Sequence, residues 1–363
     1  MPETIAAATK RLEQAIPLAK AASWDAVGLQ VGDPAAPVAR AVVCHEVTED
    51  VVAQAQSGDL VISYHPLLFR PTTAFVAGKS ATGRAYRLTK RGAALYVVHT
   101  AFDVASGGCA EALAAALGLK NVVGFGATWP ADSSKIVTFV PGSAAADLTA
   151  AMAAAGGGHI GRYSECSFAI DGVGSYRPGA GASPLVGKPG ELSREPEVRV
   201  EMHLPSSATE AVVSALVASH PYDEPAFDVY ATRANAGFVG RVGVLGHPTA
   251  LGALAADTVA GALATAVKTA GNPDRIVSRI AVVPGSGSEL VGAAADAGAD
   301  VIVTGDVSHH RANEAVARGL AVIDAGHVAT ERPGVAKLYS LVSELFDEVV
   351  DLTHIDPSPW GIA

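Results

Sequence analysis

The chain repeats one strand–helix–strand pattern in its first and last thirds, and this repeat limits the folds that it can adopt. Residues 40–68 place an apolar strand before a polar helical stretch and a second apolar strand, which ends at Tyr64 and His65. Residues 279–310 follow the same order, with the second strand ending at Gly305 and Asp306. Apolar strands joined through helices predict βαβ-type units in a mainly parallel sheet that helices cover on both faces.

Both copies continue into a further strand with polar residues just beyond it. Residues 91–98 lead to His99, and residues 318–323 lead to Gly326 and His327. Ligands of parallel sheets gather beyond the carboxyl ends of the strands, so these polar residues are candidates for a shared site. The candidates at these strand ends are Tyr64, His65, His99, Asp103, His327 and Glu331.

Histidine and carboxylate side chains together form a ligand set that suits Zn²⁺, Mn²⁺ or Fe²⁺ and that allows a bound ion to activate water. His327 and Glu331 are four residues apart, which places them on one face of a helical turn. The pattern therefore indicates a hydrolase-like metal centre between two related halves.

The segment between the halves has a different character. It is predicted to contain the strands 135–140, 167–170, 197–203 and 226–230 and the helices 144–155 and 208–219. This order predicts a small α+β ferredoxin-like domain. The predicted fold is thus α/β, with a domain at 133–235 inserted between the halves 1–132 and 236–363.

Length and charge narrow the function classes. The 363 residues exceed what one hydrophobic core usually supports, and 49% are apolar. The net charge is −10 and the basic residues are scattered, which argues against nucleic acid as a partner. Charged residues interrupt the apolar residues of 1–22, and no apolar run reaches the ~20 residues of a membrane span. We expect a cytoplasmic protein without membrane contact.

Two smaller signals each have two interpretations. Cys44, Cys109 and Cys166 lack metal or disulfide spacing and are interpreted as small buried hydrophobes, with a reactive thiol at Cys109 as the alternative. The turn 285–288 lacks the lysine of a phosphate-binding loop, and the cluster at 220–224 is interpreted as a turn rather than a second metal site.

Several sequence blocks occur together in an order that resembles one family. These blocks are residues 24–32, 64–67 and 99–103, Thr304-Gly305-Asp306 with His310, and Gly326-His327 with Thr330-Glu331. The chain resembles the GTP cyclohydrolase type-two homologue family, also called Nif-three-like dinuclear metal proteins, over nearly its whole length. Residues 161–168 and 220–226 look like the middle domain of its longer bacterial members.

The resemblance implies a dinuclear centre with up to two divalent ions per chain, most simply Zn, with Mn or Fe as alternatives. It implies His65, Asp103, His327 and Glu331 as ligands, with Glu331 as the expected bridge between two ions through its two oxygens. The family's first histidine falls at Tyr64, and a phenol binds metal well only when it is deprotonated. Three outcomes are open: a phenolate from Tyr64, a weakened second site, or one ion with water in the missing position.

Two further histidines are candidates for proton transfer. His99 is expected to orient a neighbour or to relay protons, rather than to bind metal directly. His310 either faces the cleft as a proton shuttle or caps the next helix, and Asp306 is judged in the same way.

The resemblance implies a metal-dependent hydrolase that acts on a nucleotide or small heterocycle, as in the opening of the guanine ring of GTP with loss of formate. The alternative is a non-catalytic metal-handling or metal-regulated binding protein in which the insert senses a ligand. Arg70 and Arg311 would favour the enzyme if they handled a phosphate. The expected partners are a small-molecule substrate and further copies of this chain in a closed homo-oligomer, commonly a hexamer in the family.

Overall fold

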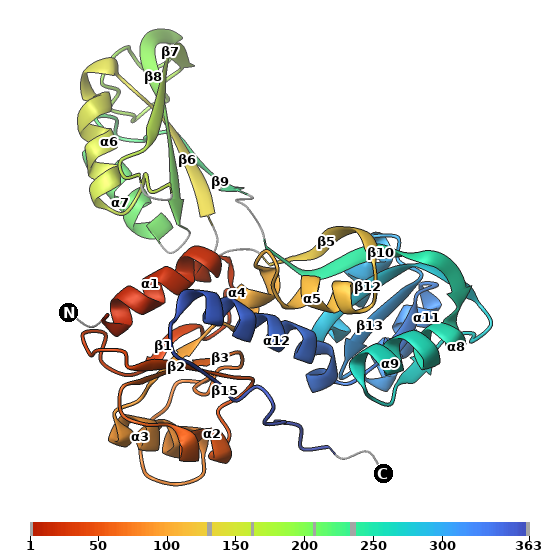
Figure 1. Cartoon of the computed structure of the whole chain (residues 1–363). Helices are drawn as coiled ribbons and strands as arrows, with labels where there is room; N and C mark the ends of the chain where they lie inside the picture. The colour runs from red at the N-terminus through yellow and green to blue at the C-terminus, as the bar shows by residue number, and fades with distance from the viewer. Residues whose placement is uncertain (1–2, 129–132, 161–162, 206–207, 233–236, 361–363) are drawn as a thin grey trace. The chain divides into compact units, whose positions relative to one another are not determined.

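The chain forms two compact units, each with its own core. The computed structural model describes residues 3–128, 133–160, 163–205, 208–232 and 237–360 (Figure 1). Unit 1 combines Met1–Thr128 with Ala236–Ala363, and unit 2 is Trp129–Asn235. Unit 2 includes residues 133–235, the segment that the sequence predicted to be an inserted domain.

The first sheet of unit 1 contains the earlier copy of the sequence repeat. Its strands, in spatial order, are β1 (Gly28–Val31), β4 (Ala94–Val97), β3 (Asp59–Ser63), β2 (Arg40–Cys44) and β15 (Val349–Asp351). β15, β2, β3 and β4 are parallel, and β1 runs antiparallel to β4. Every residue of β3 is buried, as expected for a central strand that is covered on both faces.

The second sheet contains the later copy of the repeat. Its order is β11 (Lys268–Ala270), β14 (Ala321–Asp324), β13 (Val301–Gly305), β12 (Ile276–Ser286), β10 (Gly237–Ala250) and β5 (Lys120–Thr128). β12, β13 and β14 are parallel, whereas β11, β10 and β5 join them in antiparallel fashion. The α/β class is confirmed. The parallel strands of the two repeat copies lie in separate sheets, and antiparallel strands join both sheets.

Helices cover both faces of each sheet, and two of them contribute to both sheets' cores. α5 (Cys109–Ala116) places Cys109 in the core of the first sheet and Leu113 in that of the second. α12 (His327–Leu345) places Ala329 in the second core and Leu338 in the first. Figure 1 shows both helices in the middle of unit 1. The start of α12 is therefore held where the two sheets meet.

The remaining helices of unit 1 are mostly short, and several begin at a side chain that caps the first turn. Thr4, Thr48, Ser80 and Ser308 accept hydrogen bonds from the backbone of α1, α2, α3 and α11. The bounds are α1 Ile5–Ala15, η1 Leu18–Lys20, α2 Glu49–Gln54, α3 Ala81–Arg91, α4 His99–Val104, α8 Leu251–Ala253, the π-helical η4 Leu254–Val259, α9 Ala260–Leu263, η5 Ser288–Leu290, α10 Val291–Asp296 and α11 His309–Ala317.

Unit 2 is one antiparallel sheet with two helices on one face (Figure 1). The strands, in spatial order, are β7 (Ser167–Tyr176), β8 (Ser193–Pro205), β6 (Ser133–Val140) and β9 (Phe227–Thr232). The helical segments are η2 (Gly142–Ala144), α6 (Ala145–Ala154) and α7 (Thr209–Ser219). Val200 and Met202 of β8 pack against Leu148 and Leu216 of these helices. Because side chains alternate along a strand, the odd-numbered neighbours in β8 face the opposite side of the sheet.

No helix within the described ranges is long and apolar enough to cross a membrane.

Candidate metal centre

The carboxylate of Glu331 lies buried among three histidines. Its Oε2 is 2.7 Å from Nε2 of His45 and 3.2 Å from Nε2 of His65, and its Oε1 is 3.1 Å from Nε2 of His327. The Glu331 residue is 2% exposed. One carboxylate and three imidazole rings thus lie close together.

The fold explains why these residues meet. His45 is the first residue after β2 and His65 the second after β3, and these adjacent parallel strands end at the same edge of the first sheet. His327 opens α12, and Glu331 follows one turn later. Gly285, with φ of 64°, leaves room for the carboxylate, because a Cβ there would lie 2.4 Å from Glu331 Oε1. That glycine serves close packing in the turn that we had considered for phosphate binding.

The pKa values of Glu331, His65 and His327 depend on one another. Burial lowers the pKa of His65, but hydrogen bonds with Glu331 and Glu46 outweigh burial and raise the pKa to about 10. Burial also lowers the pKa of His327, but the interactions with Glu331 and Asp306 together outweigh burial and raise that pKa to about 9. Burial would raise the pKa of Glu331, but its histidine partners hold that pKa well below the usual range. At neutral pH the metal-free cluster is therefore a buried carboxylate that is neutralised by protonated imidazoles.

A second buried carboxyl group, that of Asp103, is held differently. The hydroxyl of Tyr64 donates to its Oδ1 at 2.6 Å. Burial raises the pKa of Asp103 to about 6, while nearby His99 and Tyr64 oppose that rise. Burial and the neighbouring Asp103 raise the pKa of Tyr64 well above its ordinary value, so this phenol keeps its proton. The Tyr64–Asp103 pair is thus a neutral donor bound to a carboxyl group, rather than a phenolate ready to bind an ion.

Two outer carboxylates orient histidines of the cluster. Asp25 accepts from Nδ1 of His99 at 2.8 Å and from the backbone N–H of Thr100 at 3.0 Å. Asp306 lies 2.7 Å from Nδ1 of His327. An imidazole whose Nδ1–H donates to a carboxylate presents the lone pair of Nε2 on its other side. Both residues therefore resemble the outer partners that orient histidines in metal sites.

The donor set fits a divalent cation. His45, His65 and Glu331 each offer a ligand atom within 4.8 Å of the others, and His327 adjoins the same carboxylate. Imidazole nitrogens with a carboxylate oxygen suit Zn²⁺, Mn²⁺ and Fe²⁺. A divalent ion would replace the positive charge that the protons on His65 and His327 supply in the metal-free cluster. These residues are accordingly the ones that would hold a metal.

The predicted site residues separate into two groups in the structure. His65, His327 and Glu331 come together, with Tyr64, Asp103 and His99 beside them: the ring centroids of His99 and His65 are 5.4 Å apart. His310 lies exposed in α11, where its described contact is with the His309 ring, and Ser308 is the cap of that helix. Neither the shuttle nor the capping role that we considered for His310 is supported by a contact.

Other residues near the site have structural partners. Arg311 pairs with Glu289 and Glu314 at 2.6 and 2.8 Å. Cys109 is fully buried, which raises the pKa of its thiol well above the ordinary value. Such a thiol is a packed hydrophobe, so the reactive interpretation of Cys109 is disfavoured.

Sequence reasoning missed His45. Its signal was present, because His45 directly follows the first strand of the repeat just as His65 follows the second. Only the second strand end was considered as a source of ligands. The ends of neighbouring parallel strands lie at the same edge of a sheet, so His45 was a candidate ligand on the same grounds as His65.

Comparison with known proteins identifies the relatives of this chain. Residues 4–359 match the family Duf34/NIF3 (NGG1p interacting factor 3). The chain belongs to this family. It is 36% identical over 357 residues to the "GTP cyclohydrolase 1 type 2 homolog" of Bacillus subtilis, which covers 96% of this chain and 95% of that protein. It is 38% identical over 360 residues to the protein of the same name in Mycobacterium tuberculosis, at 97% and 95% coverage.

Solved structures of the Duf34/NIF3 family share the fold. A Bacillus cereus protein related to NIF3 is 32% identical, with a TM-score of 0.65 and full coverage of both chains. A Staphylococcus aureus protein is 25% identical, with a TM-score of 0.69 and coverage of 100% of this chain and 99% of that one. The resemblance that the sequence blocks indicated is thereby confirmed.

Proposed function

We propose that the chain is a metal-dependent hydrolase that acts on a nucleotide or small heterocycle. The observation that carries the proposal is the Glu331 carboxylate enclosed by His45, His65 and His327. When bound there, a divalent ion supplies Lewis-acid chemistry and lowers the pKa of water toward ~7. The relatives named "GTP cyclohydrolase 1 type 2 homolog" support GTP or a similar nucleotide as the substrate, although that name belongs to those proteins.

The residues of this chain divide the remaining work. His45, His65, His327 and Glu331 hold the ion, and Asp306 orients His327. His99, oriented by Asp25, has its Nε2 available to take up a proton from the reacting group and to return it to the leaving group. We propose His99, and not the exposed His310, as the proton relay.

The surroundings of Glu331 and Asp103 support a number of bound ions per chain. Glu331 faces three imidazoles, whereas Asp103 is engaged by the phenol of Tyr64. We propose that the chain binds one ion tightly, with Zn as the simplest choice and Mn or Fe as alternatives. A second ion would have to displace Tyr64 from Asp103.

The test combines metal analysis with turnover. Protein stripped with a chelator is reloaded with Zn²⁺, Mn²⁺ or Fe²⁺, its metal content is counted, and release of formate from GTP is measured. We expect about one ion per chain and metal-dependent formate, both lost in Glu331→Gln. The variant Glu344→Gln alters an exposed carboxylate of the same helix and should leave both unchanged.

A non-catalytic role is the second candidate. In it, the centre handles or senses metal, and unit 2 is a ferredoxin-like module that binds a regulatory ligand. The four antiparallel strands with α6 and α7 on one face support that interpretation of unit 2. Stoichiometric metal without formate from GTP would favour this candidate over GTP hydrolysis.

The family resemblance also predicts a closed homo-oligomer, with a hexamer as its expected form. Light scattering of the purified chain tests that prediction, since a monomeric mass would contradict it.

A further inference from the structure

Unit 2 contains a cavity whose lining residues all belong to this unit, whereas the residues of the metal centre belong to unit 1. Its volume is about 620 Å³, within the range of pockets that hold small organic molecules. It lies on the face of the sheet opposite α6 and α7, because Glu197 and Arg199 line it while Val198 and Val200 pack on the helix side. The segments 177–185 and 222–226 form its other walls.

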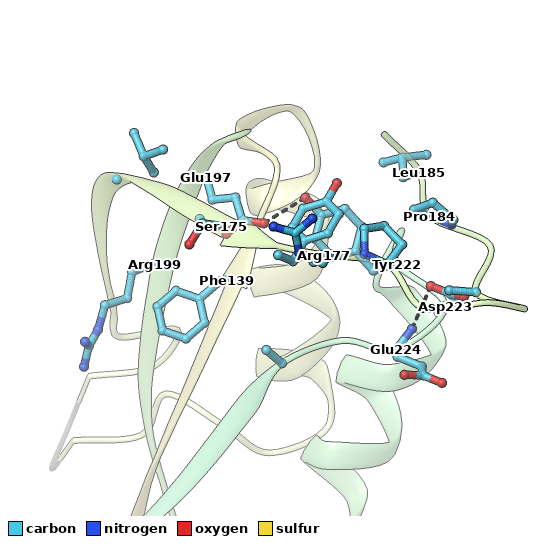
Figure 2. Close-up of a pocket in the computed structure, with 18 of the residues that line it drawn as sticks. Phe139, Ser175, Arg177, Pro184, Leu185, Glu197, Arg199, Tyr222, Asp223 and Glu224 are labelled. Carbon is cyan, nitrogen blue, oxygen red and sulfur yellow. Dashed lines mark hydrogen bonds between the residues drawn. The ribbon is translucent and has the colours of Figure 1, made fainter. Parts of the chain in front are cut away.

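The most informative group in this cavity is the carboxylate of Glu197. The residue is 8% exposed, and its Oε1 accepts a hydrogen bond from the hydroxyl of Tyr222 at 2.8 Å. Figure 2 shows this pair at the cavity wall. Within the described ranges, no cationic side chain pairs with Glu197, and Oε2 has no hydrogen-bond donor. Oε2 is not among the buried atoms that lack a partner, so this oxygen opens into the cavity, where a positively charged group can meet it.

The neighbouring backbone makes room for that carboxylate. A Cβ on Gly174 of β7 would lie 1.9 Å from Oε2 of Glu197. Any side chain at position 174 would therefore push the carboxylate from its place. Gly172 lies directly opposite Glu197 in the strand pairing and also lines the cavity. Two glycines of β7 thus leave the acidic group open to the cavity.

Hydrogen bonds fix the other wall. Nε2 of His220 lies 3.0 Å from the carbonyl oxygen of Phe139, and the backbone N–H of Tyr222 donates to Nδ1 of His220 at 3.1 Å. Asp223 accepts from the backbone N–H of Ser183 at 3.0 Å, which ties the two loop walls together. Tyr222 is therefore held in place, with the ring of Tyr176 6.3 Å away.

The charge of the lining is acidic. Its charged residues are Asp171, Glu197, Asp223 and Glu224 against Arg177 and Arg199. Arg199 is engaged by Glu201 at 2.7 Å, and Arg177 donates to the backbone carbonyl of Gly190. Aromatic rings beside an excess of carboxylates favour a cation with an apolar body, because the faces of such rings attract positive charge.

We propose that the unit 2 cavity binds a small organic cation whose amidinium, guanidinium or ammonium group meets Glu197 while its apolar body lies beside Tyr176 and Tyr222. The ligand supplies the positive partner that Glu197 lacks. This site is independent of the metal centre and of the proposed hydrolysis.

Benzamidine and benzamide form a matched pair of probes, because both are planar and similar in size but only benzamidine is a cation at neutral pH. Binding to the full chain is measured by titration calorimetry. We expect benzamidine to bind at least tenfold more tightly than benzamide. Equal affinity for the two compounds, or no binding of benzamidine, would overturn the proposal.

Three variants locate the binding. Glu197→Gln keeps an oxygen for Tyr222 but removes the charge, and it should lower benzamidine affinity at least tenfold without altering weak benzamide binding. Gly174→Ala, which displaces the carboxylate without changing it, should act in the same direction. Glu195→Gln removes a charge one alternation along β8 from Glu197 and outside the lining, so it should lower the affinity far less than Glu197→Gln does.

Folding and metal content serve as controls for these variants. Circular dichroism and the count of bound metal should match the wild type in all three. Unchanged benzamidine affinity in both Glu197→Gln and Gly174→Ala would show that the cation binds elsewhere and would refute the site. If one of the two failed to fold, the other would still decide.

Discussion

Asp103 and Glu331 are both buried carboxyl groups of the same cluster, yet their surroundings drive their pKa values in opposite directions. Burial raises the pKa of Asp103 to about 6, whereas three histidines hold that of Glu331 well below its usual range. Burial alone therefore does not decide the charge of a carboxyl group. The partners decide it, and they make Glu331 the anion around which a metal can assemble.

The largest expected effect is on Glu331 itself. In Glu331→Gln we expect metal affinity to fall more than ~100-fold, because loss of an outer partner alone costs 10- to 100-fold in metal sites. Competition with a fluorescent chelator measures the change. Retention of wild-type affinity would show that the histidines bind the ion without the carboxylate.

A change of Tyr64 tests whether its hydrogen bond to Asp103 prevents a second ion from binding there. In Tyr64→His, the phenol that engages Asp103 is replaced by a metal ligand, so we expect bound metal to rise from one ion to about two per chain. Elemental analysis of the purified variant provides the count. A count of two in the wild type as well would mean that Tyr64 does not limit occupancy.

Tyr64→Phe removes the same hydrogen bond without adding a ligand. It leaves a buried carboxyl group without its donor, and we expect the free energy of unfolding to fall by ~1–3 kcal/mol. The pKa of Asp103 should rise above about 6, because the Tyr64 hydrogen bond lowers it. Chemical denaturation gives the first quantity, and the carboxyl carbon shift in a pH titration gives the second.

The charge state of the Glu331 cluster predicts a pH dependence of stability. His65 and His327 have pKa values of about 10 and about 9 in the fold, above the ~6.5 of an unfolded histidine. Their contribution is complete below ~pH 6.5 and is lost as the pH rises through the folded values. Metal-free protein should therefore melt at progressively lower temperature as the pH rises in that window.

Two comparisons separate this effect from general alkaline instability. In Glu331→Gln the fall of melting temperature with pH should largely disappear. Glu331 is the partner that His65 and His327 share, and it contributes most to the rise of both pKa values. Metal-loaded protein should also keep its melting temperature, since coordination requires the unprotonated histidines that higher pH favours. Parallel slopes in all three samples would contradict the assignment to His65 and His327.

The smallest expected effect concerns orientation. Asp306→Asn removes the charge beside Nδ1 of His327, and we expect metal affinity to fall ~10-fold, as for other outer partners. Asp296→Asn, an exposed carboxylate of α10, is the matched control. No loss in Asp306→Asn would mean that packing alone orients His327.

The sequence carried much of the local information. Apolar runs indicated the central strands near 41–43 and 59–63, which lie in β2 and β3. The four-residue spacing of His327 and Glu331 indicated one helix face, as α12 shows. Such patterns are local, because strand burial and helical periodicity depend on residues that are close in the chain. Family membership could likewise be recognised from short blocks.

Other features are determined by contacts between distant residues. Nothing local to β5, β10 or β11 shows that they join the parallel strands in antiparallel fashion. His45 and Glu331 meet although they are 286 positions apart in the sequence, and the bond of Tyr64 to Asp103 depends on which rotamers fit a packed core. The sequence by itself thus determined the elements of the repeat and of the insert, the family and most candidate ligands. Only the tertiary structure decided which carboxylate the histidines enclose, because partner choice in a buried cluster follows from three-dimensional packing.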